Sequence, residues 1–330
     1  MEQTLSVEHY LRLVQNQGSI DELSVVFGQH YITVDTRDHN PSLANINTVT
    51  PQPQCPVIAL ATNDVDQFAF VDVIAQDQQE LALLTTAIDK NPLAATLLVQ
   101  LLRHSERNTV AERLLAESLS YSCLQHSDNF RQWLTQYPQP KDHNVSESLT
   151  PPLLLHRDAA QLTITFNRSH KHNAYNAALR DALYEALMLA DSDTSITRTL
   201  IKGAGANFCA GGDLQEFGTA RDGAAAHLAR TTRSNALLLD RLKLSTQFVL
   251  HGACIGAGIE LPAFSANISA HCDSFFQLPE VAMGLIPGAG GTVSIANRIG
   301  RQRLAFMAIS NKKIDAEQAL NWGLIDQIHG

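Results

Sequence analysis

The sequence predicts an α/β fold, because strand-like and helical segments alternate through its second half. From about residue 151 to residue 330, short apolar runs are followed by turns or by apolar residues at helical spacing. A polar, proline-containing stretch at 137–152 precedes this half and is the best candidate for a linker. We therefore divide the chain into two regions, residues 1–150 and residues 151–330.

Composition excludes several classes of protein. A chain of 330 residues with 45% apolar content can bury one large core or two modest ones. The net charge is −9, and no basic run is longer than Lys312–Lys313, so we expect no nucleic-acid partner. The start lacks a secretory pattern, and His251 and Glu260 interrupt the longest apolar stretch, so we expect a cytoplasmic protein without membrane insertion. The five cysteines lack paired spacing, which predicts reduced thiols.

The first region opens with a helical stretch, VEHYLRLVQ, and a polar segment rich in Asn, Pro and Thr that is typical of a loop. PVIALAT and FAFVDVIA then read as two strands joined at Asn63 and Asp64, followed by the helical pattern DQQELALLTTAI. This order predicts a hairpin and then a helix.

Three helical runs follow: NPLAATLLVQLLRH, TVAERLLAESLSYSCLQ and SDNFRQWL. Their expected N-terminal caps are Asn91, Thr109 and Ser127, and Pro92 fits a first helical turn. They predict a small helical block.

The second region begins with another hairpin pattern, PLLLHRDAAQLTITFN, and an amphipathic helix, NAALRDALYEALMLADSD. The hairpin-plus-helix openings at Pro56 and Pro151 raise the hypothesis of an internal duplication.

Two glycine-rich turns follow strand-like runs: FCAGGDL after TLIKG, and HGACIGAGIE after TQFVL. Small residues in such turns let backbone N–H groups point into a cleft, where a carbonyl oxygen can accept them. The alternative for either turn alone is an ordinary tight turn that caps a helix.

Two glutamates, Glu260 and Glu280, lie twenty positions apart within apolar runs. Loss of water would raise the pKa of each toward the range where a carboxyl group serves as an acid or a base. The alternative is a pair of surface carboxylates at helix starts. His170 and His172 have no further ligand at metal-binding spacing, so no metal site is expected. The glycines of IPGAGG do not form a dinucleotide-binding fingerprint.

FCAGGDL, IGAGIEL and LPEVAMGLIPGAGGT resemble the three signature segments of the crotonase (enoyl-CoA hydratase/isomerase) superfamily. NRSHKHNAYN resembles its first CoA-side loop, and the likeness runs from about Leu153 to Gly330. The resemblance implies a crotonase-like spiral of repeated ββα units, here with an added N-terminal hairpin and helical region.

Residue by residue, the resemblance implies two N–H donors of an oxyanion hole, on Ala210 and Ala257. It gives Glu260 the role of activating water and Glu280 that of delivering the α-carbon proton, although a coupled pair can share both roles. The remaining implied site residues are Gly211, Gly212 and Asp213 at the thioester, and Lys171, His172 and Asn173 in the CoA-side loop, where a solvated loop charge is the alternative.

The activity implied is hydration of a 2-enoyl-CoA, with no cofactor or metal because coenzyme A is part of the substrate. Alternatives are an isomerase or other enolate chemistry on the same fold, or a non-catalytic subunit. The resemblance also implies a homo-oligomer, a trimer or hexamer.

The sequence departs from the family in two places. The usual C-terminal helical segment does not follow GLIDQIHG, and Ala266 stands where an acidic residue is common. The helical block at 91–134 is expected either to cover the acyl pocket in place of that segment or to form a separate domain.

Overall fold

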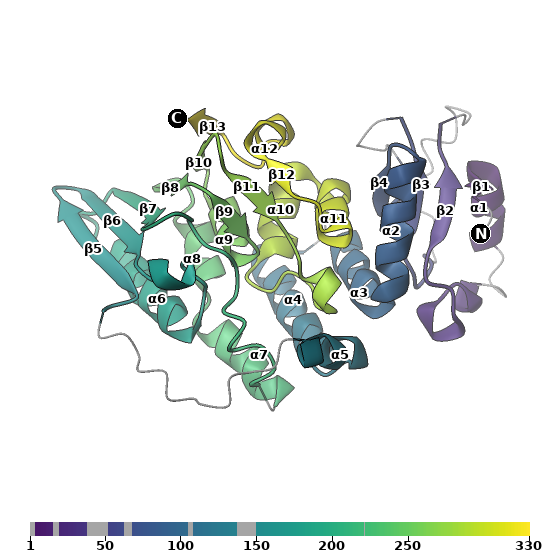
Figure 1. Cartoon of the computed structure of the whole chain (residues 1–330), viewed down its shortest axis with the longest axis horizontal. Coiled ribbons are helices and arrows are strands. Elements are labelled where there is room, and N and C mark those ends of the chain that lie inside the picture. The colour runs from purple at the N-terminus through teal and green to yellow at the C-terminus, as the bar shows by residue number, and fades with distance from the viewer. Residues whose placement is uncertain are drawn as a thin grey trace.

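The computed structural model describes residues 4–15, 20–37, 52–62, 68–104, 108–136, 150–220 and 222–330. Within them the strands form three sheets (Figure 1). The N-terminal sheet is parallel and has the order β1 (Leu5–Ser6), β2 (Ile32–Asp35), β3 (Val57–Leu60), β4 (Val73–Ala75). The large sheet has the order β13 (Gln327–His329), β10 (Asn267–His271), β8 (Thr246–Leu250), β7 (Arg198–Gly203), β6 (Gln161–Phe166), β5 (Leu153–Asp158). The small sheet has the order β12 (Ile314–Asp315), β11 (Phe275–Gln277), β9 (Ala253–Ile255).

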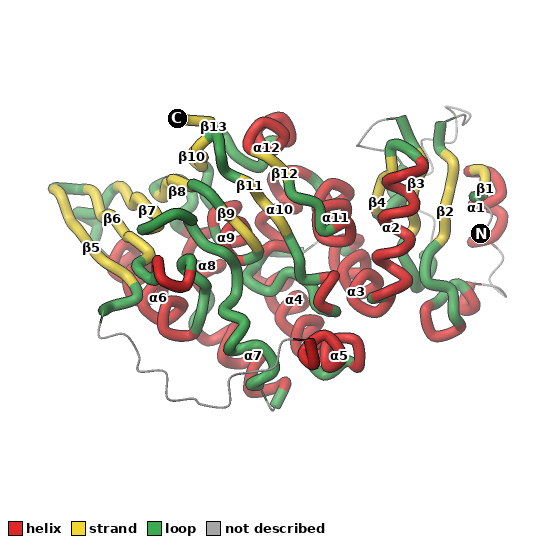
Figure 2. Tube along the Cα trace, viewed as in Figure 1, coloured by secondary structure: helices red, strands yellow, loops and turns green. Residues whose placement is uncertain are grey.

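Helices occupy the space between and around these sheets. Those of the N-terminal region are α1 (Val7–Gln15), α2 (Gln78–Lys90), α3 (Pro92–Arg103), α4 (Val110–Leu124) and α5 (Asp128–Gln136). Those of the C-terminal region are α6 (Ala177–Ser192), α7 (Gly223–Thr232), α8 (Asn235–Arg241), α9 (Ala257–Glu260), α10 (Gly291–Ile299), α11 (Arg301–Ser310) and α12 (Ala316–Trp322). Figure 2 shows α3, α4, α10 and α11 between the N-terminal sheet and strands β5–β8. No described helix combines the length and the apolar character needed to cross a bilayer.

The C-terminal region confirms the predicted α/β fold. Strands β5 and β6 form the expected antiparallel hairpin, with Leu153 opposite Phe166. Further along, β8 belongs to the large sheet and β9 to the small sheet, and α9 follows them. In the same way, β10 belongs to the large sheet and β11 to the small sheet, and α10 follows. The chain therefore passes between the two sheets in ββα order.

The predicted N-terminal hairpin is wrong. Strands β3 and β4 pair in parallel, with Ile58 beside Val73, and β3 also pairs in parallel with β2. Both strands are fully buried, and such continuous apolar runs are typical of parallel sheets covered on both faces. The stretch between them is long enough for the crossover that parallel pairing requires. The hypothesis of a duplicated hairpin unit loses its basis. Asn63, Asp64 and residues 137–149 of the predicted linker lie outside the described residues.

The three predicted helices of the block are α3, α4 and α5. Thr109 forms a full capping box with Glu112, and the Ser127 hydroxyl accepts the Phe130 N–H at 3.2 Å. Asn91 precedes α3 as predicted, but its side chain makes no capping hydrogen bond; its side-chain amide donates to the Ala282 carbonyl at 3.4 Å.

The helical block shares its core with the C-terminal region. Leu98, Leu102 and Leu114 belong to the same buried cluster as Leu304 and Ile309 of α11. Polar contacts also join the N-terminal and C-terminal regions. Arg113 of α4 donates to Asn297 at 2.7 Å, and Glu80 of α2 pairs with Lys312 at 2.9 Å. The alternative in which these helices bury only each other is therefore wrong.

Expression of residues 151–330 alone is expected to give insoluble or incompletely folded protein. Removal of α2–α4 would expose the buried faces of α10 and α11, at a cost of about 25 cal/mol for each Å² of apolar surface. Solubility and circular dichroism, compared with the full chain prepared in the same way, provide the measurement. A monodisperse fragment whose circular dichroism shows all the helix that residues 151–330 form in the full chain would contradict the shared core.

Candidate active site

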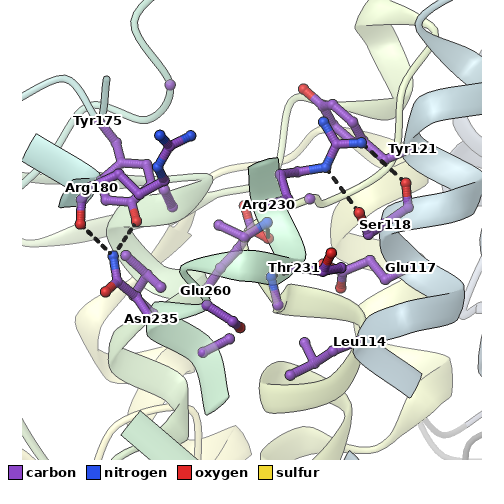
Figure 3. A pocket seen from close by; sticks show the side chains of 18 of the residues that line it. Leu114, Glu117, Ser118, Tyr121, Tyr175, Arg180, Arg230, Thr231, Asn235 and Glu260 are labelled. Carbon is purple, nitrogen blue, oxygen red and sulfur yellow. Dashed lines mark hydrogen bonds between the residues drawn. The ribbon is translucent and has the colours of Figure 1, made fainter. Parts of the chain in front are cut away.

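A cavity of about 490 Å³ lies between α4 and the C-terminal region. Figure 3 shows Leu114, Glu117 and Ser118 of α4 on one side, Tyr175 and its neighbours on the other, and Glu260 between them. Its volume is in the range of small-molecule sites. The predicted residues Gly212, Asp213, Ala257, Glu260 and Glu280 all contribute to its lining.

Glu260 lies at the end of the short helix α9 and is almost fully buried. One carboxylate oxygen, Oε2, accepts the N–H groups of Ala289 at 2.8 Å and Gly291 at 2.9 Å. Burial raises the pKa of Glu260 well above its usual value, and the charges of Glu280 and Glu117 raise it further, whereas the two N–H groups lower it. The Oε1 atom has no such partner among the described residues.

Glu280 follows β11 and has a buried Oε2 atom that makes no hydrogen bond within the described part of the chain. Burial raises its pKa from 4.5 to about 8, and the charge of Glu117 contributes in the same direction. An unpartnered buried carboxyl oxygen in a cavity favours the protonated form, which can donate.

The carboxylates of Glu260 and Glu280 both lie close to Gly256. A Cβ atom built on this residue would lie 2.5 Å from Oε1 of Glu280 and 3.7 Å from Oε1 of Glu260. The two oxygens are therefore separated by no more than the sum of these distances. Any side chain at 256 would displace Glu280, and the positive φ of 49° also favours glycine.

The two glycine-rich turns lie side by side. Cys209 and Cys254 form a parallel bridge, and Gly258 packs so closely that a Cβ atom there would lie 2.2 Å from the Cys209 carbonyl oxygen. Ala257 begins α9, and its N–H donates to no backbone or side-chain acceptor among the described residues. This N–H is available to a ligand in the cavity.

Ala210 differs from the expectation, because its N–H is already engaged. It donates to the carbonyl of His172 at 3.0 Å. The short helix at Ser169–Lys171 ends at His172, which adopts a left-handed conformation with φ of 52°. The pairing joins segments far apart in the sequence, so no local pattern predicts it.

The other residues of the first turn have mainly structural contacts. Gly211 has φ of 94°, and a Cβ atom at Gly212 would meet the Phe217 ring at 2.7 Å. Asp213 lines the cavity, but its carboxylate pairs with Arg168 at 2.8 Å. The carboxylate of Asp213 therefore holds Arg168 in this structure, and substrate binding by Asp213 stays a prediction.

Within the predicted CoA-side loop, Asn173 is fully buried. Its side chain accepts the Arg168 N–H at 2.8 Å and donates to the carbonyls of Ala204 and Asn207 at 2.8 and 2.9 Å. Asn173 thus fixes the shape of the loop. Lys171 and His172 lie nearer the surface but do not line the cavity, and their contact with CoA stays a prediction.

Glu117, Tyr121 and Arg230 are among the cavity residues that were not predicted from the sequence. Arg230 donates to Ser118 and Ser122, and its guanidinium lies over the Tyr121 ring at 4.9 Å. Charged residues in amphipathic helices are usually solvated, so nothing local to α4 or α7 indicates that these face a site.

Two buried carboxylates that converge beside the free N–H of Ala257 can carry out acid–base chemistry. The chain belongs to the enoyl-CoA hydratase/isomerase family, whose family model matches residues 156–330. The crotonase superfamily and its mixed α/β fold, expected from the signature segments, are confirmed.

Relatives with curated names match the same half of the chain. The 2,3-dehydroadipyl-CoA hydratase of Escherichia coli is 34% identical over 176 residues, which cover 53% of this chain and 68% of that protein. The 1,2-epoxyphenylacetyl-CoA isomerase of Escherichia coli is 31% identical over 180 residues, which cover 53% and 69%. The structure of an enoyl-CoA hydratase from Thermoplasma volcanium matches with a TM-score of 0.51 and 28% identity, over 55% of this chain and 72% of that one.

Proposed function

We propose that this protein is an enoyl-CoA hydratase that adds water to a 2-enoyl-CoA. The observation that carries the proposal is the convergence of Glu260 and Glu280 beside Gly256. Addition of water across a conjugated double bond requires one base and one acid, held close enough to act on adjacent carbon atoms. A double-bond isomerase can operate with a single carboxyl group, so the second buried glutamate favours hydration.

The two glutamates have unequal surroundings, and this supports separate roles. Two N–H groups stabilise the charged form of Glu260, whereas Oε2 of Glu280 has no described partner. We assign the proton of a singly protonated pair to Glu280, because the two N–H groups favour the carboxylate form of Glu260. Glu260 then removes a proton from water as its oxygen bonds to the β carbon, and Glu280 gives its proton to the α carbon.

The thioester oxygen gains negative charge during this step, and backbone N–H groups stabilise it. Ala257 supplies the free donor. Ala210 becomes a second donor only when the carbonyl of His172 moves away from its N–H. After addition, the proton on Glu260 returns to Glu280 directly or through solvent, and the site is restored without a cofactor. Assembly into a trimer or hexamer remains a prediction.

Purified full-length protein is expected to convert crotonyl-CoA into 3-hydroxybutyryl-CoA. The measurement is the loss of enoyl-thioester absorbance in water enriched in heavy oxygen, with mass spectrometry of the product. Hydration incorporates one labelled oxygen atom, because the hydroxyl group comes from water. A 3-enoyl-CoA tested in parallel is the control. Its conversion to a 2-enoyl-CoA without label, combined with no hydration of crotonyl-CoA, would identify an isomerase instead.

A further inference from the structure

Glu117 lies on α4, outside the segment that matches the family model, and its side chain is buried in the wall of the cavity. Its Oε1 atom accepts the Gly290 N–H at 2.8 Å. Its Oε2 atom accepts the N–H of Thr292 at 3.0 Å and the hydroxyl of Thr292 at 2.5 Å. All of these contacts are to the turn that opens α10.

The same turn holds Glu260. Four consecutive N–H groups alternate between the two carboxylates, with Ala289 and Gly291 bound to Glu260 and Gly290 and Thr292 bound to Glu117. The first N–H groups of a helix have no partner within the helix, and here α10 donates them to both glutamates. A shift of this turn caused by loss of Glu117 would therefore displace the Glu260 carboxylate.

Packing fixes α4 against this turn. A Cβ atom at Gly288 would lie 2.5 Å from the Tyr121 ring, and Arg113 donates to Asn297 of α10 at 2.7 Å. The position of Glu117 therefore does not depend on a single hydrogen bond.

We propose that Glu117 is a positioning residue for the Glu260–Glu280 pair, supplied to the site by the N-terminal region. It orients Glu260 through the shared turn, and its negative charge favours retention of a proton by the pair. The expected effect of Glu117 on catalysis rests on the proposed function. Its expected effect on the protonation of Glu260 and Glu280 does not depend on that function.

The charge of Glu117 acts in one direction on its neighbours. It raises the pKa values of Glu260 and Glu280, and burial raises the pKa of Glu117 itself to about 7. The titratable and charged groups near this part of α4 are Arg113 and Tyr121 of α4, His227 and Arg230 of α7, and the two glutamates of the pair. Arg230 is near Glu117 but forms no ion pair with any described carboxylate, so it offsets the charge without cancelling it.

The test compares Glu117→Gln and Glu117→Asp with the wild type, and Glu317→Gln at an exposed position of α12 serves as the matched control. Glu117→Gln is expected to lower kcat/KM by about tenfold, because a charged acceptor of the turn is lost. It is also expected to shift the pH–rate profile to lower pH, because Glu260 and Glu280 ionise more readily. Glu117→Asp keeps the charge with a shorter reach, so the rate should fall without that shift.

Infrared titration of the protonated carboxyl band, recorded without substrate, measures the protonation of the pair directly. Glu117→Gln removes the carboxyl group of residue 117 from the titration. In addition, the ionisation of Glu260 and Glu280, which forms the high-pH part of the titration, should move to lower pH. Glu317→Gln should match the wild type. An unchanged profile and titration in a folded Gln variant would overturn the inference, and so would an Asp variant that shifts as far as Gln. Failure of the proposed function alone would appear as absent hydration by the wild type with the titration shift intact.

Discussion

Replacing either Glu260 or Glu280 by Gln is expected to lower the rate of 2-enoyl-CoA hydration by about 10²-fold or more. Glutamine preserves the size of the side chain but carries neither a basic carboxylate nor an acidic proton. At position 260 its carbonyl oxygen can still accept an N–H from the α10 turn, so the structure should persist. Steady-state rates with crotonyl-CoA provide the measurement, and full activity in one variant would exclude that residue from the mechanism.

Stability gives an independent check on Glu280. Its pKa is about 8 in the folded protein against an ordinary 4.5, so its contribution to stability is present below about pH 4.5 and is lost as the pH rises through 8. A glutamine has no proton to lose. The melting temperature of Glu280→Gln is therefore expected to fall less between pH 5 and 8 than that of the wild type. Equal pH dependence in the two proteins would contradict a buried, protonated Glu280.

Replacing Ala257 by Pro is expected to lower turnover by about 10² to 10³-fold, because proline removes one oxyanion donor. The backbone at this position is compatible with proline. Ala257 is the first residue of α9, where its N–H has no intrahelical partner. The preceding Gly256 has φ of 49° and ψ of −121°. These angles are the mirror image of the extended conformation that residues before proline adopt. Glycine can adopt this mirror-image conformation because it has no Cβ atom.

Ala257→Gly is the matched control for this experiment, since it keeps the N–H and removes only the methyl group. It should retain most of the activity. Circular dichroism must first show that the proline variant is folded. A folded proline variant with wild-type turnover would place the thioester oxygen elsewhere in the cavity.

Local patterns predicted most of the elements but not all pairings. The hairpin at 153–166, the caps at Thr109 and Ser127 and the helices of the block depend on residues close in sequence, and these were found. The strands at 57–60 and 73–75 were placed correctly as strands but paired wrongly. Strand direction there depends on the chain between them and on β2, which an apolar run does not specify.

The sequence by itself determined the family and the chemical groups of the site. Glycines and glutamates at characteristic spacing, such as Gly256, Glu260 and Glu280, identify the signature turns because the turns are local structures with strict steric demands. The α/β class follows from local periodicity for the same reason.

Only the tertiary structure decided which groups share the cavity and which are already engaged. The Ala210 N–H is bound to His172, Asp213 is paired with Arg168, and Glu117 reaches the turn at Gly290 from a helix 173 residues earlier in the chain. Each of these depends on contacts between distant segments, whose partners no local pattern names. The raised pKa values of Glu260 and Glu280 depend equally on the tertiary structure, because burial by the assembled fold is their main cause.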